Sequence, residues 1–143
     1  MPEESTTPDP VELVRRFNDA WNRRDVDAFL SLLAPEVVYR PITTWPEPQE
    51  RRGSDQVRRF FIPDSPEVWT ADFTSEPRTI REHGNAVIAL LRFSGHAMAS
   101  GIEIGGGVFR VFRFRDRQIA WIEDFTDRDE ARAAAERLVE ERG

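Results

Sequence analysis

The sequence predicts an α+β domain in which helices come first, antiparallel strands follow, and one helix closes the chain. Two observations lead to this prediction. Apolar residues recur at helical spacing in the first third of the chain, and strand-like alternation replaces that spacing from Val68 onward. A length of 143 residues fits one domain that buries its own core. We therefore expect a disordered lead over residues 1–9 and a single domain over residues 10–143.

Three helices are predicted in the first part of the chain. The first begins at Asp9-Pro10, and its apolar residues follow at helical spacing: Val14, Phe17 and Trp21. Asp25 is the expected N-cap of a second, short helix, which Pro35 is expected to end. The third helix is predicted over residues 55–61.

Strands are predicted between the second and third helices and in most of the remaining chain. A short strand over residues 37–40 is followed by a proline-rich loop over residues 41–53. Turns are expected at residues 83–85 and 116–117. The later strands are predicted at Val68–Glu76, Thr79–Glu82, Ala86–Met98, Val108–Arg115 and Ile119–Phe125.

Both faces of the strand predicted over residues 86–98 are largely apolar, so both need cover. One face can pack against the N-terminal helices. The other has no obvious cover within the chain, which favours a homodimer formed through the sheet. The closing helix is expected to take Thr126 or Asp127 as its N-cap, and its apolar face consists of Ala131, Ala134, Ala135 and Leu138.

The inventory of side chains excludes many kinds of chemistry. All 20 basic residues are arginine, and the chain has no cysteine or lysine, two histidines and one tyrosine. This composition excludes disulfides, thiolate catalysis, cysteine-ligated metal clusters, Schiff-base chemistry, a phosphate-loop lysine and a three-histidine metal site. We expect neither a metal nor another cofactor.

Charge and hydropathy limit the partners and the location. The formal net charge is −6, and no basic patch with interleaved aromatic residues is present, so nucleic acid is not an expected partner. No apolar run approaches the roughly 18 residues of a membrane span. A cytoplasmic protein without a membrane partner is therefore expected.

Four polar residues fall where the predicted strands are otherwise apolar: Arg92, His96, Arg110 and Asp124. A buried arginine is costly unless it is paired, and Asp124 is the natural counter-ion. One interpretation is a catalytic or binding site, and the alternative is an ion pair that only orients the sheet. Tyr39 could donate its hydroxyl into the same cavity, or it could simply pack as an aromatic ring.

Large apolar side chains supply candidates for the lining of a pocket, with core packing as their alternative role. These candidates are Phe17, Trp21, Trp45, Phe60, Met98 and Phe112.

Several stretches of the chain form a family pattern. They are VRRFNDAWNRRDVDAF at residues 14–29, LAPEVVY at 33–39, Arg52-Gly53, and QIAWIEDF at 118–125 before DRDEA at 127–131. Over residues 10–140 the pattern resembles SnoaL-like proteins of the nuclear-transport-factor-2-like (cystatin-like cone) superfamily. The resemblance implies a curved, mostly antiparallel sheet that holds the N-terminal helices in its concave face and forms a conical pocket, often in a dimer.

The resemblance also implies roles for particular residues. Relatives include polyketide cyclases, limonene-type epoxide hydrolases, ketosteroid isomerase, dehydratases and non-catalytic binding modules. Asp124 falls where the cyclases and epoxide hydrolases carry an acid/base aspartate, and Tyr39 matches a tyrosine that orients the hydrolases' water. The epoxide hydrolases carry a three-residue Asp-Arg-Asp unit. Leu90 and Arg92 stand where those hydrolases keep its arginine and one aspartate, so the unit is incomplete in this chain.

The match to ketosteroid isomerase fails at its catalytic positions. Phe17 replaces the oxyanion tyrosine, and Arg40 and Arg110 occupy the positions of the base and of the oxyanion-hole aspartate. Steroid isomerisation by that mechanism is therefore excluded.

Two hypotheses of function follow. In the first, Asp124 is a general acid or base, Arg92 and Arg110 hold an enolate or a carboxylate, and His96 and Tyr39 donate hydrogen bonds. The ligand would be a small apolar molecule that is anionic or enolisable, and the reaction would be of the isomerase, cyclase or hydrolase type, without a metal. In the second, the same fold is a non-catalytic ligand-binding or accessory module.

Overall fold

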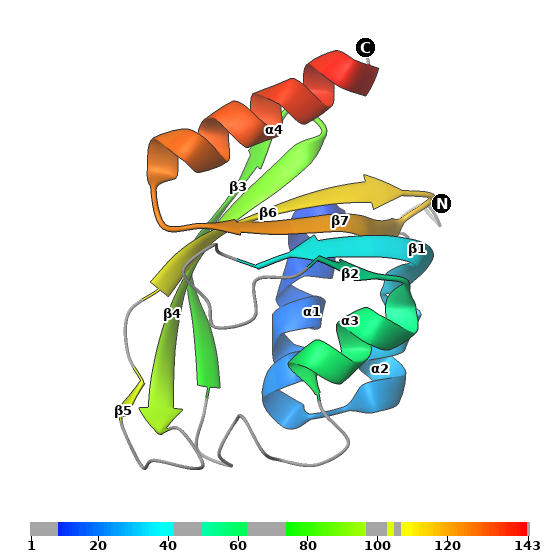
Figure 1. The fold of residues 1–143 in the computed structure, drawn as a ribbon, viewed down its shortest axis with the longest axis vertical. Helices are drawn as coiled ribbons and strands as arrows, with labels where there is room; N and C mark the ends of the chain where they lie inside the picture. Colours follow the sequence, from blue (N-terminus) through cyan, green and yellow to red (C-terminus); the bar gives the residue numbers. More distant parts are fainter. Residues whose placement is uncertain (1–8, 42–49, 63–73, 97–102, 105–106, 143) are drawn as a thin grey trace, which may run out of the picture.

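The computed structural model describes residues 9–41, 50–62, 74–96, 103–104 and 107–142. Its helices are α1 (Pro10–Arg23), α2 (Val26–Ser31), α3 (Ser54–Phe61) and α4 (Arg128–Arg142) (Figure 1). Its strands are β1 (Leu33–Arg40), β2 (Arg51–Arg52), β3 (Thr74–His83), β4 (Ala86–His96), β5 (Glu103–Ile104), β6 (Gly107–Arg115) and β7 (Gln118–Phe125). The α+β class predicted from the sequence is confirmed.

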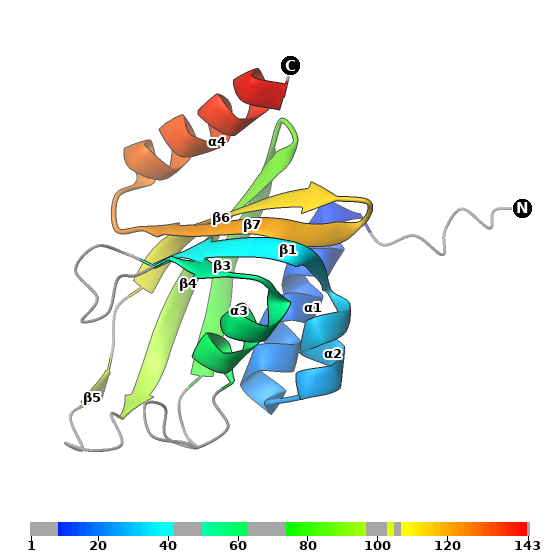
Figure 2. The same cartoon turned by 45° about the vertical axis from the view of Figure 1, so that its right-hand side comes forward.

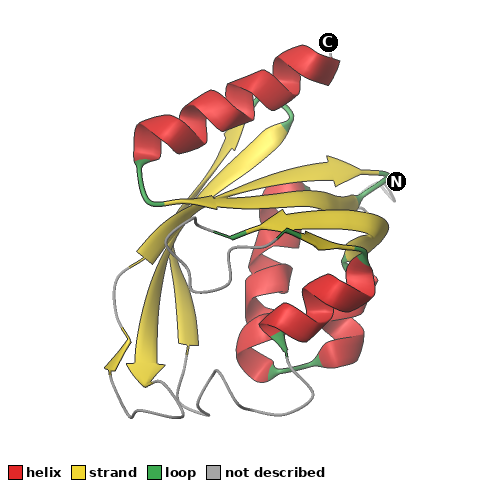
Figure 3. Ribbon diagram, in the orientation of Figure 1, coloured by secondary structure: helices red, strands yellow, loops and turns green. Residues whose placement is uncertain are grey.

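The strands form one curved sheet. Their order is β2-β1-β7-β6-β4-β3, with β5 paired to β4 off this path. Strands β1 and β7 run parallel and the other pairs are antiparallel, as the prediction of a mostly antiparallel sheet requires. The first three helices lie together on one side of the sheet, and α4 lies on the other (Figures 2 and 3).

The starts of the first two helices follow from their caps. The Asp9 carboxylate accepts a hydrogen bond from the Glu12 N–H at 2.8 Å, and the Asp25 carboxylate accepts one from the Ala28 N–H at 3.1 Å. Each bond satisfies a backbone donor that a helix leaves open at its first turn. The prediction that Pro35 ends the second helix is wrong. The helix ends at Ser31, and Pro35 lies inside β1, where a strand near the sheet edge tolerates a residue without an N–H.

The strand boundaries differ from prediction, and β1 begins at Leu33 rather than at residue 37. Strand β3 is continuous across the break expected after residue 76, because a register shift between Pro77 and Thr79 accommodates the proline within the pairing to β4. The short strands β2 and β5 were not predicted, and β2 lies inside the expected loop. Two residues are too few for the alternation of a strand to show in a sequence.

Helix α4 corrects the expectation that one sheet face has no cover within the chain. Asp127 caps this helix, accepting a hydrogen bond from the Glu130 N–H at 3.0 Å. Ala131 and Ala135 of α4 are fully buried against Ala86 and Val111. The small alanine side chains let the helix approach the sheet closely, so part of the outer face is covered by the chain itself.

Where β1 and β7 form that outer face, it carries polar and aromatic side chains. The Arg40 guanidinium lies over the half-buried ring of Trp121, 4.9 Å from its centroid, and the Trp121 N–H donates to Glu123 at 3.2 Å. The homodimer predicted through the sheet stays a prediction, and this surface is where it would form.

The main core fills the concave side of the sheet. Phe17 of α1 contacts Phe29, Phe61 and Phe112, with ring centroids 4.8–5.4 Å apart. Each of these four rings is at most 1% exposed. This aromatic core attaches the helices to the sheet and surrounds the polar groups described next.

Candidate functional site

An ion pair is buried on the concave face of the sheet. Arg110 of β6 and Asp124 of β7 are direct cross-strand partners, so both side chains point to the same face. The Arg110 Nε donates to Asp124 Oδ1 at 2.6 Å and Nη2 donates to Oδ2 at 2.9 Å. The two side chains are only 2% and 4% exposed, so each charge is stabilised by the other side chain rather than by water.

Tyr39 completes this polar cluster from a third strand. Strand β1 runs parallel to β7 and pairs Tyr39 with Ile122, two residues before Asp124. The Tyr39 hydroxyl therefore reaches Asp124 and donates to its Oδ2 at 2.7 Å. We call Tyr39, Arg110 and Asp124 the polar cluster. The structure brings these three predicted site residues together.

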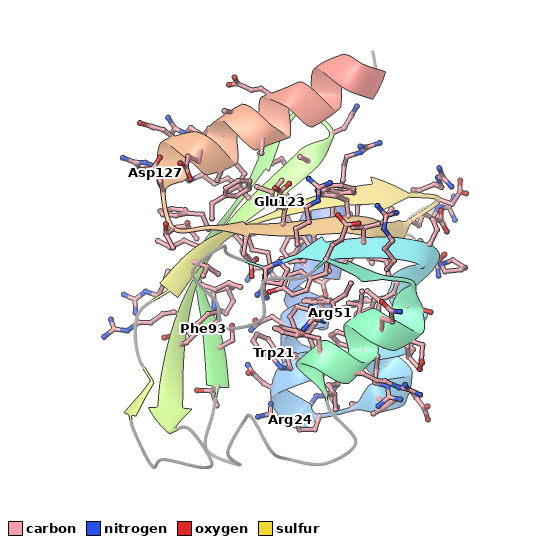
Figure 4. All side chains as sticks on the ribbon, viewed as in Figure 1. Trp21, Arg24, Arg51, Phe93, Glu123 and Asp127 are labelled. Carbon is pink, nitrogen blue, oxygen red and sulfur yellow. The ribbon has the colours of Figure 1, made fainter. Side chains whose placement is uncertain are left out.

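Aromatic rings surround the guanidinium of the polar cluster. The Arg110 Cζ lies 5.0 Å from the ring of Phe61, 5.5 Å from Trp21 and 5.8 Å from Tyr39. Trp21 lies next to Phe93 of β4 (Figure 4), and its indole N–H donates to the Phe61 carbonyl at 2.8 Å. The rings supply cation–π attraction and exclude water from the ion pair.

One donor of the polar cluster is unused. Arg110 Nη1 is buried, yet the described part of the chain offers it no hydrogen-bond partner. Leaving a buried charged donor unsatisfied costs more than the roughly 1–3 kcal/mol of a neutral group.

Burial and charge set the protonation states of the cluster. Burial raises the pKa of Tyr39 well above its ordinary value, and the neighbouring charge of Asp124 raises it further. Burial alone would lower the pKa of Arg110, but the charge and hydrogen bonds of Asp124 outweigh burial and raise it. At neutral pH Arg110 is therefore a cation and Tyr39 a neutral donor.

The raised pKa of Tyr39 predicts a loss of stability in alkaline solution. The unfolded chain releases the Tyr39 proton at about pH 10, before the folded protein does, so the free energy of unfolding falls as the pH rises above about 10. Tyr39 is the only tyrosine, and neither lysine nor cysteine is present. Ultraviolet absorbance therefore reports its titration directly, and tyrosinate is expected at a higher pH in folded than in urea-unfolded protein. Tyr39→Phe is the control that lacks this signal. Coincident titrations would contradict the prediction.

Arg92 lies apart from the polar cluster. It pairs with Glu76 of β3 and Gly107 of β6, and alternation along β4 places it on the face opposite Ala89, the cross-strand partner of Arg110. Its side chain is exposed and lines a groove of about 510 Å³ between α1 and β3. Alternation along β4 shows that Arg92 interrupts an apolar face. Only the register between neighbouring strands decides whether Arg92 and Arg110 lie on the same face of the sheet.

The other predicted site residues divide into three groups. Phe17 and Phe112 are core rings in contact with each other, at 5.4 Å between centroids. Phe60 is half-buried, with its ring 5.1 Å from that of Tyr39. His96 ends β4 opposite Glu103, and its side chain lies outside the described part of the structure. Trp45 and Met98 also lie outside the described residues.

Phe61 and Asn18 are features that the sequence reasoning missed. Phe61 is the ring nearest to Arg110, whereas its neighbour Phe60 was the predicted pocket residue. Asn18 and Asn22, four residues apart on α1, both donate to the Ser75 carbonyl, at 2.8 and 2.7 Å. The spacing of the two asparagines is the one signal in the sequence that could have indicated this anchor between α1 and β3.

Among the described residues, no group of three or more His, Asp or Glu side chains is placed to hold a metal ion. Within the same part of the chain, no helix combines the length and the apolar character that crossing a membrane requires.

Comparison with known proteins identifies relatives. A family model described as a SnoaL-like domain matches residues 14–122. No curated protein matches the sequence.

Solved structures share the fold. A nuclear-transport-factor-2-like protein of Burkholderia thailandensis is 25% identical, with a TM-score of 0.74 over 91% of this chain and 98% of that one. A Jannaschia protein proposed to be a SnoaL-like polyketide cyclase is 19% identical, with a TM-score of 0.68 over 90% and 95%. A cystatin-fold protein of Novosphingobium aromaticivorans is 17% identical, with a TM-score of 0.67 over 80% and 96%.

Proposed function

The chain belongs to the SnoaL-like domain family, and from this membership we propose that it binds a small, largely apolar organic molecule on the concave side of its sheet. The contact that fixes the ligand is a hydrogen bond from Arg110 to a carboxylate, enolate or carbonyl oxygen. The observation that carries the proposal is the buried Nη1 of Arg110, which has no hydrogen-bond partner among the residues that the structure describes.

The surroundings of Arg110 define the class of ligand. A cation attracts an oxygen that bears negative charge, and it does so more strongly where aromatic rings exclude water. Phe61 and Trp21, both within 5.5 Å of the guanidinium carbon, favour an apolar or aromatic body next to that oxygen. An anionic or enolisable apolar molecule meets both requirements.

Asp124 and Tyr39 position Arg110. Asp124 holds two of the guanidinium nitrogens and so orients the third, Nη1. Tyr39 keeps Asp124 in place through its hydroxyl. With three donors on one carboxylate, Asp124 is foremost a counter-ion, and this favours binding as the primary function.

Acid–base catalysis is the second candidate, and the Oδ1 atom of Asp124 favours it. This oxygen accepts one hydrogen bond, from Arg110 Nε, which leaves a lone pair free. Asp124 would take a proton from the carbon beside the ligand's carbonyl, and the electron pair of that C–H bond would form an enolate held by Arg110 Nη1. Returning the proton to another carbon completes an isomerisation. Such a base contributes about 10²–10⁴-fold to a rate. Turnover of an identified substrate that survived Asp124→Asn would exclude this candidate.

Calorimetric titration with 2-naphthoate tests the binding proposal. The wild-type protein is expected to bind 2-naphthoate and to bind naphthalene, which lacks the oxygen, much more weakly. Arg110→Lys keeps the charge but loses the planar fork, so the affinity for 2-naphthoate should fall about tenfold or more. Arg59→Lys is the matched control, since Arg59 is an exposed arginine on α3. Equal affinities in Arg110→Lys and the control would overturn the proposal.

A further inference from the structure

A second groove lies on the outer face of the sheet, between α4 and strands β3 and β4, with a volume of about 410 Å³. Its floor consists of the half-buried side chains of Ile88, Leu90 and Phe109. Leu90 is the cross-strand partner of Phe109, whereas its neighbour Ala89 is the partner of Arg110. The sheet therefore separates this groove from the polar cluster.

Three arginines surround this apolar floor. Arg81 stands on β3 opposite Ile88, and Arg128 and Arg132 are one helical turn apart on α4. All three side chains are exposed, and in the described ranges none of them forms an ion pair. Their charges are therefore available to a ligand.

Some exposed arginines elsewhere in the chain are paired with a carboxylate. Arg16 pairs with Glu12 at 3.2 Å and Arg59 pairs with Asp55 at 3.3 Å, each along its own helix. Arg128 lies in the first turn of α4, where a positive charge opposes the helix dipole rather than complementing it. Helix stability does not explain its position.

Two further groups at the rim limit the net charge of the groove. Glu82 lines it, and His83 lies 3.3 Å from Glu136 of α4. Three arginines against one free carboxylate leave the groove cationic in a chain whose net charge is −6. A cationic site in an acidic protein selects anions at short range.

We propose that this outer groove binds an amphipathic carboxylate, whose apolar chain or ring covers Ile88, Leu90 and Phe109 while its head group meets the arginines. A guanidinium matches a carboxylate with two parallel hydrogen bonds, which fixes the head group. The volume falls within the roughly 300–1,000 Å³ typical of small-molecule sites. This site is independent of the ligand proposed for Arg110.

Decanoate is the probe for this groove. Calorimetry is expected to detect binding of decanoate, weaker binding of 1-decanol and none of acetate, because both the charge and the apolar chain are required. Octanoate, two methylenes shorter, should bind about tenfold more weakly. Changes in backbone amide shifts at Arg81, Leu90 and Phe109 in nuclear magnetic resonance spectra locate the site.

Paired substitutions test the role of the arginines. Arg128→Gln with Arg132→Gln is expected to weaken decanoate binding about tenfold or more, because charge-assisted hydrogen bonds are lost. Arg16→Gln with Arg59→Gln removes the same charge from other helices and should leave the affinity unchanged. Circular dichroism verifies that both pairs fold.

Four outcomes would overturn the proposal. Equal binding of 1-decanol and decanoate would exclude a role for the arginines, as would equal losses in the two paired variants. Amide shifts at Tyr39 and Asp124 that disappear in Arg110→Lys would assign decanoate to the polar cluster instead, leaving the proposed function standing. A dimer weakened by Arg128→Gln with Arg132→Gln, without decanoate binding, would make the groove an interface between two copies.

Discussion

Replacing Asp124 with asparagine is expected to lower the free energy of unfolding by about 3–5 kcal/mol, because the variant leaves the charge of Arg110 buried without a counter-ion. Asparagine keeps the size of the side chain, so the loss reports charge rather than packing. Arg110 is 2% exposed, so water cannot replace the lost carboxylate. Urea unfolding followed by circular dichroism measures the effect.

Glu36→Gln is the matched control for Asp124→Asn. Glu36 pairs with Arg115 on the surface, where the two side chains are 48% and 62% exposed. Water and salt screen such a pair, so its loss should change the stability by less than about 1 kcal/mol. Similar losses in the two variants would contradict the buried, desolvated state of the Arg110–Asp124 pair.

Replacing Phe61 with alanine is expected to destabilise the fold by about 3–5 kcal/mol, the usual effect of removing a buried phenylalanine. Phe61 is fully buried, and its ring contacts Phe17, Trp21 and Tyr39 at centroid distances of 4.8–5.2 Å. It is also the aromatic side chain nearest to the Arg110 guanidinium, at 5.0 Å. The variant therefore loses both core packing and the shield around the ion pair.

Phe60→Ala, one residue away, is the control for Phe61→Ala. The Phe60 ring is only half-buried, so less apolar area is exposed when it is removed. A smaller loss of unfolding free energy is expected, again from urea unfolding. A larger loss of unfolding free energy in Phe60→Ala than in Phe61→Ala would contradict the placement of Phe61, rather than Phe60, in the core.

Local signals in the sequence predicted the helices and most of the sheet. Asp9 and Asp25 are strong caps because their short carboxylates reach the open N–H groups of the first turn, and both helices begin where these residues predict. Pro35 misled because proline ends helices and also occurs in strands. Whether Pro35 ends a helix or lies in a strand depends on the strands packed beside it, which the local sequence does not show.

The candidate site was only partly predictable, for a different reason. Alternation identifies a polar residue on an apolar strand face, which is how Arg92, Arg110 and Asp124 were found. It does not say which faces of neighbouring strands coincide, because this depends on register. The register makes Asp124 the cross-strand partner of Arg110 and Glu76 that of Arg92. Arg110 is therefore buried beside a carboxylate, whereas Arg92 is exposed.

The proposed function rests on one uncommon combination. A buried salt bridge alone is weak evidence for binding, because it can serve only to orient strands. Here the described residues supply no hydrogen-bond partner to one nitrogen of the same guanidinium, and aromatic rings lie around it. The proposed ligand contact would explain both the pair and the unpartnered N–H.

The crystal structure of the protein with 2-naphthoate is the most direct test of this role for Arg110. We predict a carboxylate oxygen of the ligand within hydrogen-bonding distance of Nη1, with the bonds from Arg110 and Tyr39 to Asp124 intact and the naphthalene ring beside Phe61 and Trp21. A protein group bonded to Nη1, with the ligand bound elsewhere, would contradict it.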